Sequence, residues 1–307
     1  MNEESKKPWG DKIAVAMIHG AGGQDETCVD VLKAAIKKEF SNLVKGVDVD
    51  SCLKFKPVHW AYIMQVPEDE LRRKMKKFDF PWKWLREFVV SYAADAFAYQ
   101  PSSKDRTVYD KIHAEVARSL HSLALDAGEN APLCVIGHSL GTVITSNYFY
   151  DISQNLTSPN VQKHMGVNSL EQGKTFVLFY TMGCPIALWG VRFNNFGKPI
   201  IVPVKGAAVF YPPVKGGWMN LYERHDVFSF PLQPLNDEYN AIVRDCSVRI
   251  GNCICHLFPT CHMHYWSSRG GAACIAEGLA RIWCTINNKT FIPSKRRCSC
   301  FCDKKCY

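Results

Sequence analysis

The sequence predicts an α/β protein with a mostly parallel central sheet. Five short apolar runs of strand length alternate with longer amphipathic stretches of helical spacing, which is typical of parallel strands joined by helices. One apolar run leads directly into a G-x-S-x-G motif, and a stretch of helix length follows the motif at once. The chain has 307 residues, of which 47% are hydrophobic and 21% are charged, so it is long and apolar enough to bury a large core.

The expected elements follow in order along the chain. Apolar runs predict strands at residues 12–19, 52–60, 132–137, 175–182 and 218–222. Apolar residues at helical spacing predict helices at residues 28–40, 109–127, 140–150 and 272–283. The first strand ends in a glycine-rich stretch, residues 20–23, which predicts a tight turn.

Three segments depart from this alternation and divide the chain. We expect residues 1–294 to form one domain, in which residues 61–108 are a helical insertion like a lid or cap. Residues 185–217 are rich in Pro and Gly and predict an excursion from the sheet edge, which can form a pocket wall. Residues 295–307 form a basic, cysteine-rich tail.

The positive charge is concentrated in two segments. The formal net charge is +8, yet residues 71–90 hold seven Lys or Arg and two acids, and residues 295–307 hold five and one. Such local patches argue against a nucleic-acid surface spread over the domain. Residues 72–92 interleave basic and aromatic side chains, which leaves two interpretations: a cap helix with a solvated basic face, or an interfacial helix in peripheral contact with an anionic membrane.

Neither end of the sequence predicts export or insertion into a membrane. No apolar run approaches the roughly 18 residues of a spanning helix. Residues 1–8 hold two acids and no apolar core, unlike a secretory signal. We therefore expect a cytoplasmic protein, with peripheral membrane association as the alternative.

The 14 cysteines are expected to be reduced, because nothing indicates an oxidising compartment. In the tail, C-x-C-x-C-x₃-C is an awkward arrangement for a single tetrahedral metal site, so we expect no metal. Thioester lipidation beside the basic residues and an exposed tail without a role remain as interpretations of Cys298, Cys300, Cys302 and Cys306.

The G-x-S-x-G motif predicts a catalytic serine at a nucleophile elbow, with the sequence Gly137-His138-Ser139-Leu140-Gly141. At such a turn the serine has a strained backbone, and a side chain at either flanking glycine would collide with the neighbouring strand and helix. Two backbone N–H groups are then expected to form an oxyanion hole. One belongs to Leu140 and the other to Ala21 in the loop after the first strand, with Gly22 as the next choice.

The acid and the general base are expected after Ser139, in that chain order. Glu223 and Asp226 lie just beyond the strand at residues 218–222, and Asp245 is a further candidate for the acid. Shortly before the last helix, His262 and His264 both qualify as the base.

The chain resembles the α/β-hydrolases, in particular bacterial-type serine hydrolases that are esterase- or lipase-like. The resemblance runs over nearly the whole chain before the tail and rests on IHGAGGQ, PVHWAYIMQ, IGHSLGTVITSNYFYD, TMGCPI, WMNLYERHDVFSFPL and HMHYW. It implies the α/β-hydrolase fold with lid-like insertions and a Ser-Asp-His triad. It places Asp226 at the acid position and His262, three residues before Tyr265-Trp266, at the base position.

Motif and resemblance together imply a serine hydrolase that cleaves a carboxylic ester through an acyl-enzyme, without a cofactor or a metal. The expected partner is a small-molecule or lipid ester. Two alternatives stay open: a hydrolase fold kept as a non-catalytic binding or scaffold protein at a membrane, and an acyltransferase that uses the same triad.

Overall fold

The protein is built on a parallel sheet. The computed structural model describes residues 11–21, 29–78, 81, 83–102, 105–211, 214–250 and 260–292. These residues form a six-stranded sheet in the order β2-β1-β3-β4-β5-β6, and every neighbouring pair is parallel. The strands are β1 (Ile13–Ile18), β2 (Leu53–Val58), β3 (Leu133–His138), β4 (Phe176–Met182), β5 (Gly217–Tyr222) and β6 (Val243–Ser247).

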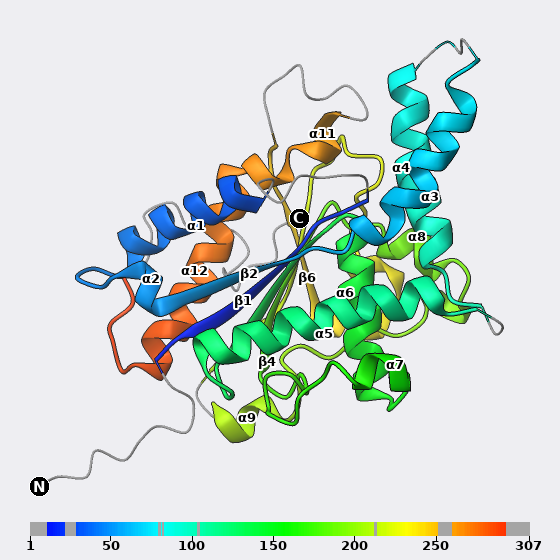
Figure 1. Cartoon of the computed structure of the whole chain (residues 1–307). Helices are drawn as coiled ribbons and strands as arrows, with labels where there is room; N and C mark the ends of the chain where they lie inside the picture. Colours follow the sequence, from blue (N-terminus) through cyan, green and yellow to red (C-terminus); the bar gives the residue numbers. More distant parts are fainter. Residues whose placement is uncertain are drawn as a thin grey trace, which may run out of the picture.

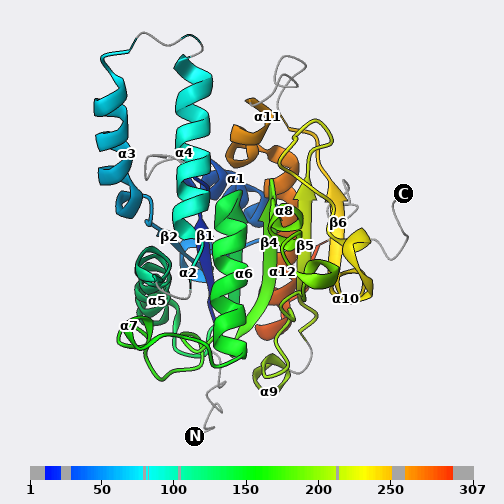
Figure 2. The same cartoon turned by 90° about the vertical axis from the view of Figure 1, so that its right-hand side faces the viewer.

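The central strands are buried on both faces. Every residue of β1, β3 and β4 is buried, which explains why these strands appear in the sequence as continuous apolar runs without alternation. Helices α1 (Asp30–Leu43) and α12 (Arg269–Ile286) cover one face of the sheet (Figures 1 and 2). Helices α5 (Thr107–Ala127), α6 (Leu140–Ser153) and α8 (Ile186–Gly190) cover the other.

Two helices stand beyond the sheet. Figure 2 shows α3 (Tyr62–Met75) and α4 (Lys83–Tyr99) side by side, extending past the edge where the strands end. Both fall within residues 61–108, the segment expected to form a helical insertion. Shorter elements complete the described chain: α2 (Val49–Cys52), α7 (Pro159–Gln162), η2 (Asn194–Phe196), α9 (Ala207–Phe210), η3 (Gln233–Leu235), α10 (Asp237–Ile242), α11 (Thr260–Met263) and η5 (Tyr265–Ser267).

The architecture, a parallel sheet with helices on both faces, agrees with the α/β-hydrolase fold that the resemblance implies. All five expected strands and all four expected helices are confirmed, with ends that differ by a few residues. Strand β6 and the short helices α2, α7, α8, α9, α10 and α11 were not predicted. The tail, residues 295–307, lies outside the described residues, so the domain boundary near residue 294 stays a prediction. Among the described residues, no helix is both long enough and apolar enough to cross a membrane.

Candidate active site

Ser139 occupies the turn between β3 and α6. Its φ of 51° and ψ of −126° lie outside the regions that L-residues ordinarily adopt, so the surrounding structure must hold this conformation. The Ser139 amide donates a hydrogen bond of 2.9 Å to the carbonyl oxygen of Met182, the last residue of β4. The serine is therefore fixed at the edge of the sheet where the strands end.

Close packing at this turn leaves room only for glycine on either side of the serine. A Cβ atom at Gly141 would lie 2.6 Å from the carbonyl oxygen of His19, and one at Gly137 would lie 3.0 Å from Cα of Thr142. A Cβ at Gly20 would lie 2.6 Å from Cβ of Ser139, so the loop after β1 packs directly on the serine. The predicted collisions at the flanking glycines are confirmed.

His262 lies between Ser139 and Asp226 and contacts both. Its Nε2 atom is 2.7 Å from Oγ of Ser139, and its Nδ1 atom is 2.9 Å from Oδ2 of Asp226. Ser139 comes from the turn before α6, Asp226 from the loop after β5, and His262 from α11. All three residues are at most 4% exposed, so this chain of hydrogen bonds is shielded from water.

Electrostatics in the site favour an ionised Asp226. Burial alone would raise the pKa of this carboxyl group. Two interactions outweigh burial and hold the pKa of Asp226 below its ordinary value. His262 contributes a hydrogen bond and an electrostatic attraction, and the amide of Phe228 donates a hydrogen bond of 3.0 Å to Oδ1. An ionised Asp226 accepts the Nδ1 proton of His262, which leaves Nε2 free to accept a proton from Ser139.

His138 positions the backbone of His262. Its Nε2 atom donates a hydrogen bond of 2.9 Å to the carbonyl oxygen of His262, and its side chain is fully buried. Burial lowers the pKa of His138 to about 3, so the ring is neutral. The structure adds a specific bond between the residue before the serine and the histidine that contacts it.

Of the candidate oxyanion donors, Leu140 directly follows the serine, and Ala21 directly follows Gly20, which packs on the serine. Leu140 is the first residue of α6, so its amide has no partner inside the helix. Ala21 is partly buried and ends the described part of the loop, and Gly22 lies outside it. His19 holds this loop: its Nδ1 atom donates a hydrogen bond of 2.8 Å to the carbonyl oxygen of Gly20, and its ring stacks on that of Trp60 at 5.2 Å.

The other candidate residues have different partners. Glu223 accepts a hydrogen bond of 2.9 Å from the amide of Ile250 and contacts His225. Asp245 accepts from the amides of Leu232 and Gln233, at 3.0 and 2.8 Å. His264 is exposed. The geometry therefore brings together Ser139, His262 and Asp226, and it leaves Glu223, Asp245 and His264 away from the serine.

Aromatic side chains border the site, and the sequence analysis did not identify them. The ring of Phe228 lies 5.1 Å from that of His262, and Tyr92 of α4 lies 4.5 Å from Phe228 and 6.4 Å from His262. Helix α4 of the insertion thus reaches the histidine. The only signal in the sequence was the aromatic content of residues 72–92, which did not say which ring would point inward.

The described cysteines are free and buried, namely Cys52, Cys134, Cys184, Cys246, Cys261, Cys274 and Cys284. The tail cysteines lie outside the described part of the chain. Within the part that the structure describes, no group of three or more His, Cys, Asp or Glu could hold a metal ion.

Comparison with known proteins adds a distant likeness. No family model matches the chain, and no curated protein matches it. The esterase domain of a Rhodothermus marinus protein is 11% identical, with a TM-score of 0.33 over 89% of this chain and 86% of that one. A structure reported for LipS and LipT, two metagenome-derived lipolytic enzymes, is 12% identical, with a TM-score of 0.34 over 81% of this chain and 88% of that one.

Proposed function

We propose that the protein is a serine hydrolase that cleaves a carboxylic ester through a covalent acyl-enzyme. One observation carries this proposal: the buried chain of hydrogen bonds from Asp226 through His262 to Ser139, at 2.9 and 2.7 Å. A buried carboxylate, a histidine and a serine hydroxyl in this order are the groups that nucleophilic catalysis at an acyl carbon requires.

The acylation step follows from this geometry. Nε2 of His262 takes the proton of Ser139 as Oγ attacks the carbonyl carbon of the ester. Asp226 stabilises the imidazolium that forms, and the N–H groups of Leu140 and Ala21 donate to the oxyanion of the tetrahedral intermediate. When this intermediate collapses, the bond to the alcohol breaks, and the alcohol leaves with the proton of His262.

Deacylation repeats these roles with water. A water molecule gives its proton to His262 and attacks the acyl carbon on Ser139. The ester bond to the serine then breaks, Oγ recovers a proton from His262, and the carboxylic acid leaves. The rings of Tyr92 and Phe228 beside the histidine favour substrates with an apolar group next to the ester, whether small molecules or lipids.

The test combines covalent labelling with a matched pair of variants. We expect a fluorophosphonate probe to label Ser139, and we expect Ser139→Ala to lower kcat for p-nitrophenyl esters by about 10³-fold or more while the fold persists. Ser153→Ala is the control, because Ser153 is exposed at the other end of the same helix. Hydrolysis by Ser139→Ala at the wild-type rate would exclude the mechanism. Absence of both labelling and turnover in the wild type would favour a binding protein.

A further inference from the structure

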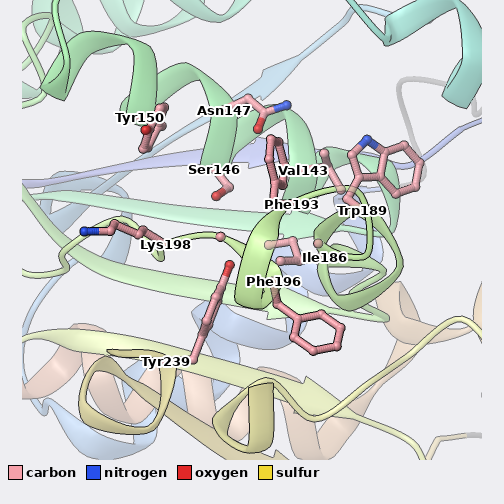
Figure 3. Close-up of a pocket in the computed structure, with 12 residues that line it drawn as sticks. Val143, Ser146, Asn147, Tyr150, Ile186, Trp189, Phe193, Phe196, Lys198 and Tyr239 are labelled. Atoms are coloured by element: carbon pink, nitrogen blue, oxygen red, sulfur yellow. The ribbon is translucent and has the colours of Figure 1, made fainter. Parts of the chain in front are cut away.

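A second pocket lies beside α6, apart from Ser139. Its walls come from α6, α8, η2 and α10, which surround a cavity of about 150 Å³ (Figure 3). Neither Ser139 nor His262 lines it. Val143, at one end, follows Ser139 by one helical turn, about 6 Å along the axis, and the pocket continues along α6 away from the serine.

The pocket has an apolar end and a polar end. Figure 3 shows the side chains of Trp189, Phe193 and Phe196 on one side. On the other side are the hydroxyl groups of Ser146 and Tyr239, with Lys198 at the outer edge. A ligand that satisfies both ends has an apolar body and one polar group.

Tyr239 is the residue that points most directly to a ligand. Its side chain comes from α10 and is 3% exposed, and its hydroxyl group points into the pocket (Figure 3). Within the described residues this hydroxyl makes no hydrogen bond, so it is available to a ligand in the pocket. Burial raises the pKa of Tyr239, so the group stays protonated and can donate.

The charge at the polar end favours an anion. Lys198 is 3.6 Å from Glu238, and the two side chains are 73% and 53% exposed. An exposed pair of this kind is weak and rearranges easily, so the ammonium group can turn to a ligand at the mouth of the pocket. A carboxylate, which only accepts hydrogen bonds, matches the donors of Lys198, Tyr239 and Ser146.

We propose that this pocket binds a small carboxylate whose apolar body is about the size of a benzene ring. The volume supports this size, because an engineered cavity of about 150 Å³ in another protein holds benzene. The ring lies among Trp189, Phe193 and Phe196, and the carboxylate accepts hydrogen bonds from Tyr239 and Ser146 near Lys198. The inference does not depend on the proposed ester hydrolysis, because the two sites share no lining residue.

Phenylacetate is the probe that tests this proposal, titrated into the full chain in a calorimeter. We expect saturable binding that Tyr239→Phe weakens about tenfold, since a hydrogen bond to a charged group is lost. Lys198→Gln should weaken binding and remove the preference for phenylacetate over the neutral phenylacetamide. Glu238→Gln is the matched control and should bind as tightly as the wild type or more tightly, because it releases Lys198.

A further arm separates this pocket from the catalytic serine. Ser139→Ala should bind phenylacetate as the wild type does, whether or not the protein proves to be a hydrolase. The proposal is overturned if the wild type shows no saturable binding, if Tyr239→Phe binds with unchanged affinity, or if binding is lost in Ser139→Ala. Tyr239→Phe removes one oxygen atom and keeps the ring, so circular dichroism and unfolding curves should match those of the wild type.

Discussion

A buried histidine far from the serine should make the fold sensitive to mild acid. His113 of α5 is 1% exposed, and its Nε2 atom shares a hydrogen bond of 2.9 Å with the hydroxyl of Tyr99. Burial, together with the nearby charge of Arg106, lowers the pKa of His113 to about 3. Replacing it by Gln keeps a side-chain amide near the position of Nε2 and removes the titration.

The magnitude follows from the difference between the two pKa values. An unfolded histidine titrates at 6.5, so below that pH the unfolded chain binds a proton that the folded His113 does not. The free energy of unfolding therefore decreases as the pH is lowered. At pH 5.5, one unit below 6.5, this decrease is about 1.4 kcal/mol. His19 and His138, whose pKa values are lowered to about 4 and about 3, act in the same direction. Together the three histidines lower the free energy of unfolding at pH 5.5 by roughly 4 kcal/mol.

Urea unfolding at pH 7 and pH 5.5, followed by tryptophan fluorescence, measures this loss. The wild type should lose about 1.3 kcal/mol more than His113→Gln between the two pH values, because about 0.2 kcal/mol is already lost at pH 7. Burial raises the pKa of Asp151, which acts in the opposite direction, and its Oδ2 lies 3.7 Å from Nδ1 of His113. The comparison is therefore repeated with Asp151→Asn in both proteins, which removes this contribution. Equal losses in the two proteins would show that folded His113 takes up a proton as readily as unfolded His113, and the reasoning would be wrong.

The remaining predictions concern the turn, the base and the basic segment. Gly141→Ala should lower the free energy of unfolding by about 1–3 kcal/mol through overpacking, whereas Gly270→Ala, where a Cβ meets open space in α12, should not lower it; equal effects in urea unfolding would contradict this. His138→Phe should lower kcat by about tenfold or more with KM little changed, and His138→Gln should restore part of it if the bond to His262 is what matters. If residues 72–92 or the tail contact membranes, the fraction of protein that sediments with anionic vesicles should decrease as the salt concentration rises, and it should decrease when residues 295–307 are deleted. Equal, negligible binding of the full-length and the truncated protein at low salt would leave both patches as solvated surface.

Local features of this protein were predictable from the sequence. Strands β1, β3 and β4 are buried on both faces, so each appears as an unbroken apolar run. The position of Ser139 was also predictable, because its strand, turn and helix are contiguous in the chain. Strand β6 lies at the sheet edge with only Val243 and Cys246 buried, and its five residues therefore carry no apolar run to detect.

Contacts between distant segments were not predictable from residue patterns alone. His262 is 123 residues from Ser139 and 36 from Asp226, so spacing left His264, Glu223 and others open until the resemblance to α/β-hydrolases selected among them. Only part of the pocket beside α6 had a signal. Residues 185–217, expected as an excursion that can form a pocket wall, supply Trp189, Phe193 and Lys198, whereas nothing in the sequence indicated that α6 and the six-residue helix α10 would complete the pocket. Proximity of this kind is a property of the packed chain.

Contacts around His262 fix its position relative to Ser139. Helix α11 has four residues and is too short to fix the orientation of a side chain by itself. The backbone of His262 is instead bonded to His138, and Ser139 is the next residue in the chain. On the opposite side, Gly183 with φ of 58° leaves room for the imidazole, since a Cβ there would lie 3.1 Å from Cε1 of His262. The separation of serine and histidine thus depends on two consecutive residues of one turn, so changes at His138 should alter turnover as well as stability.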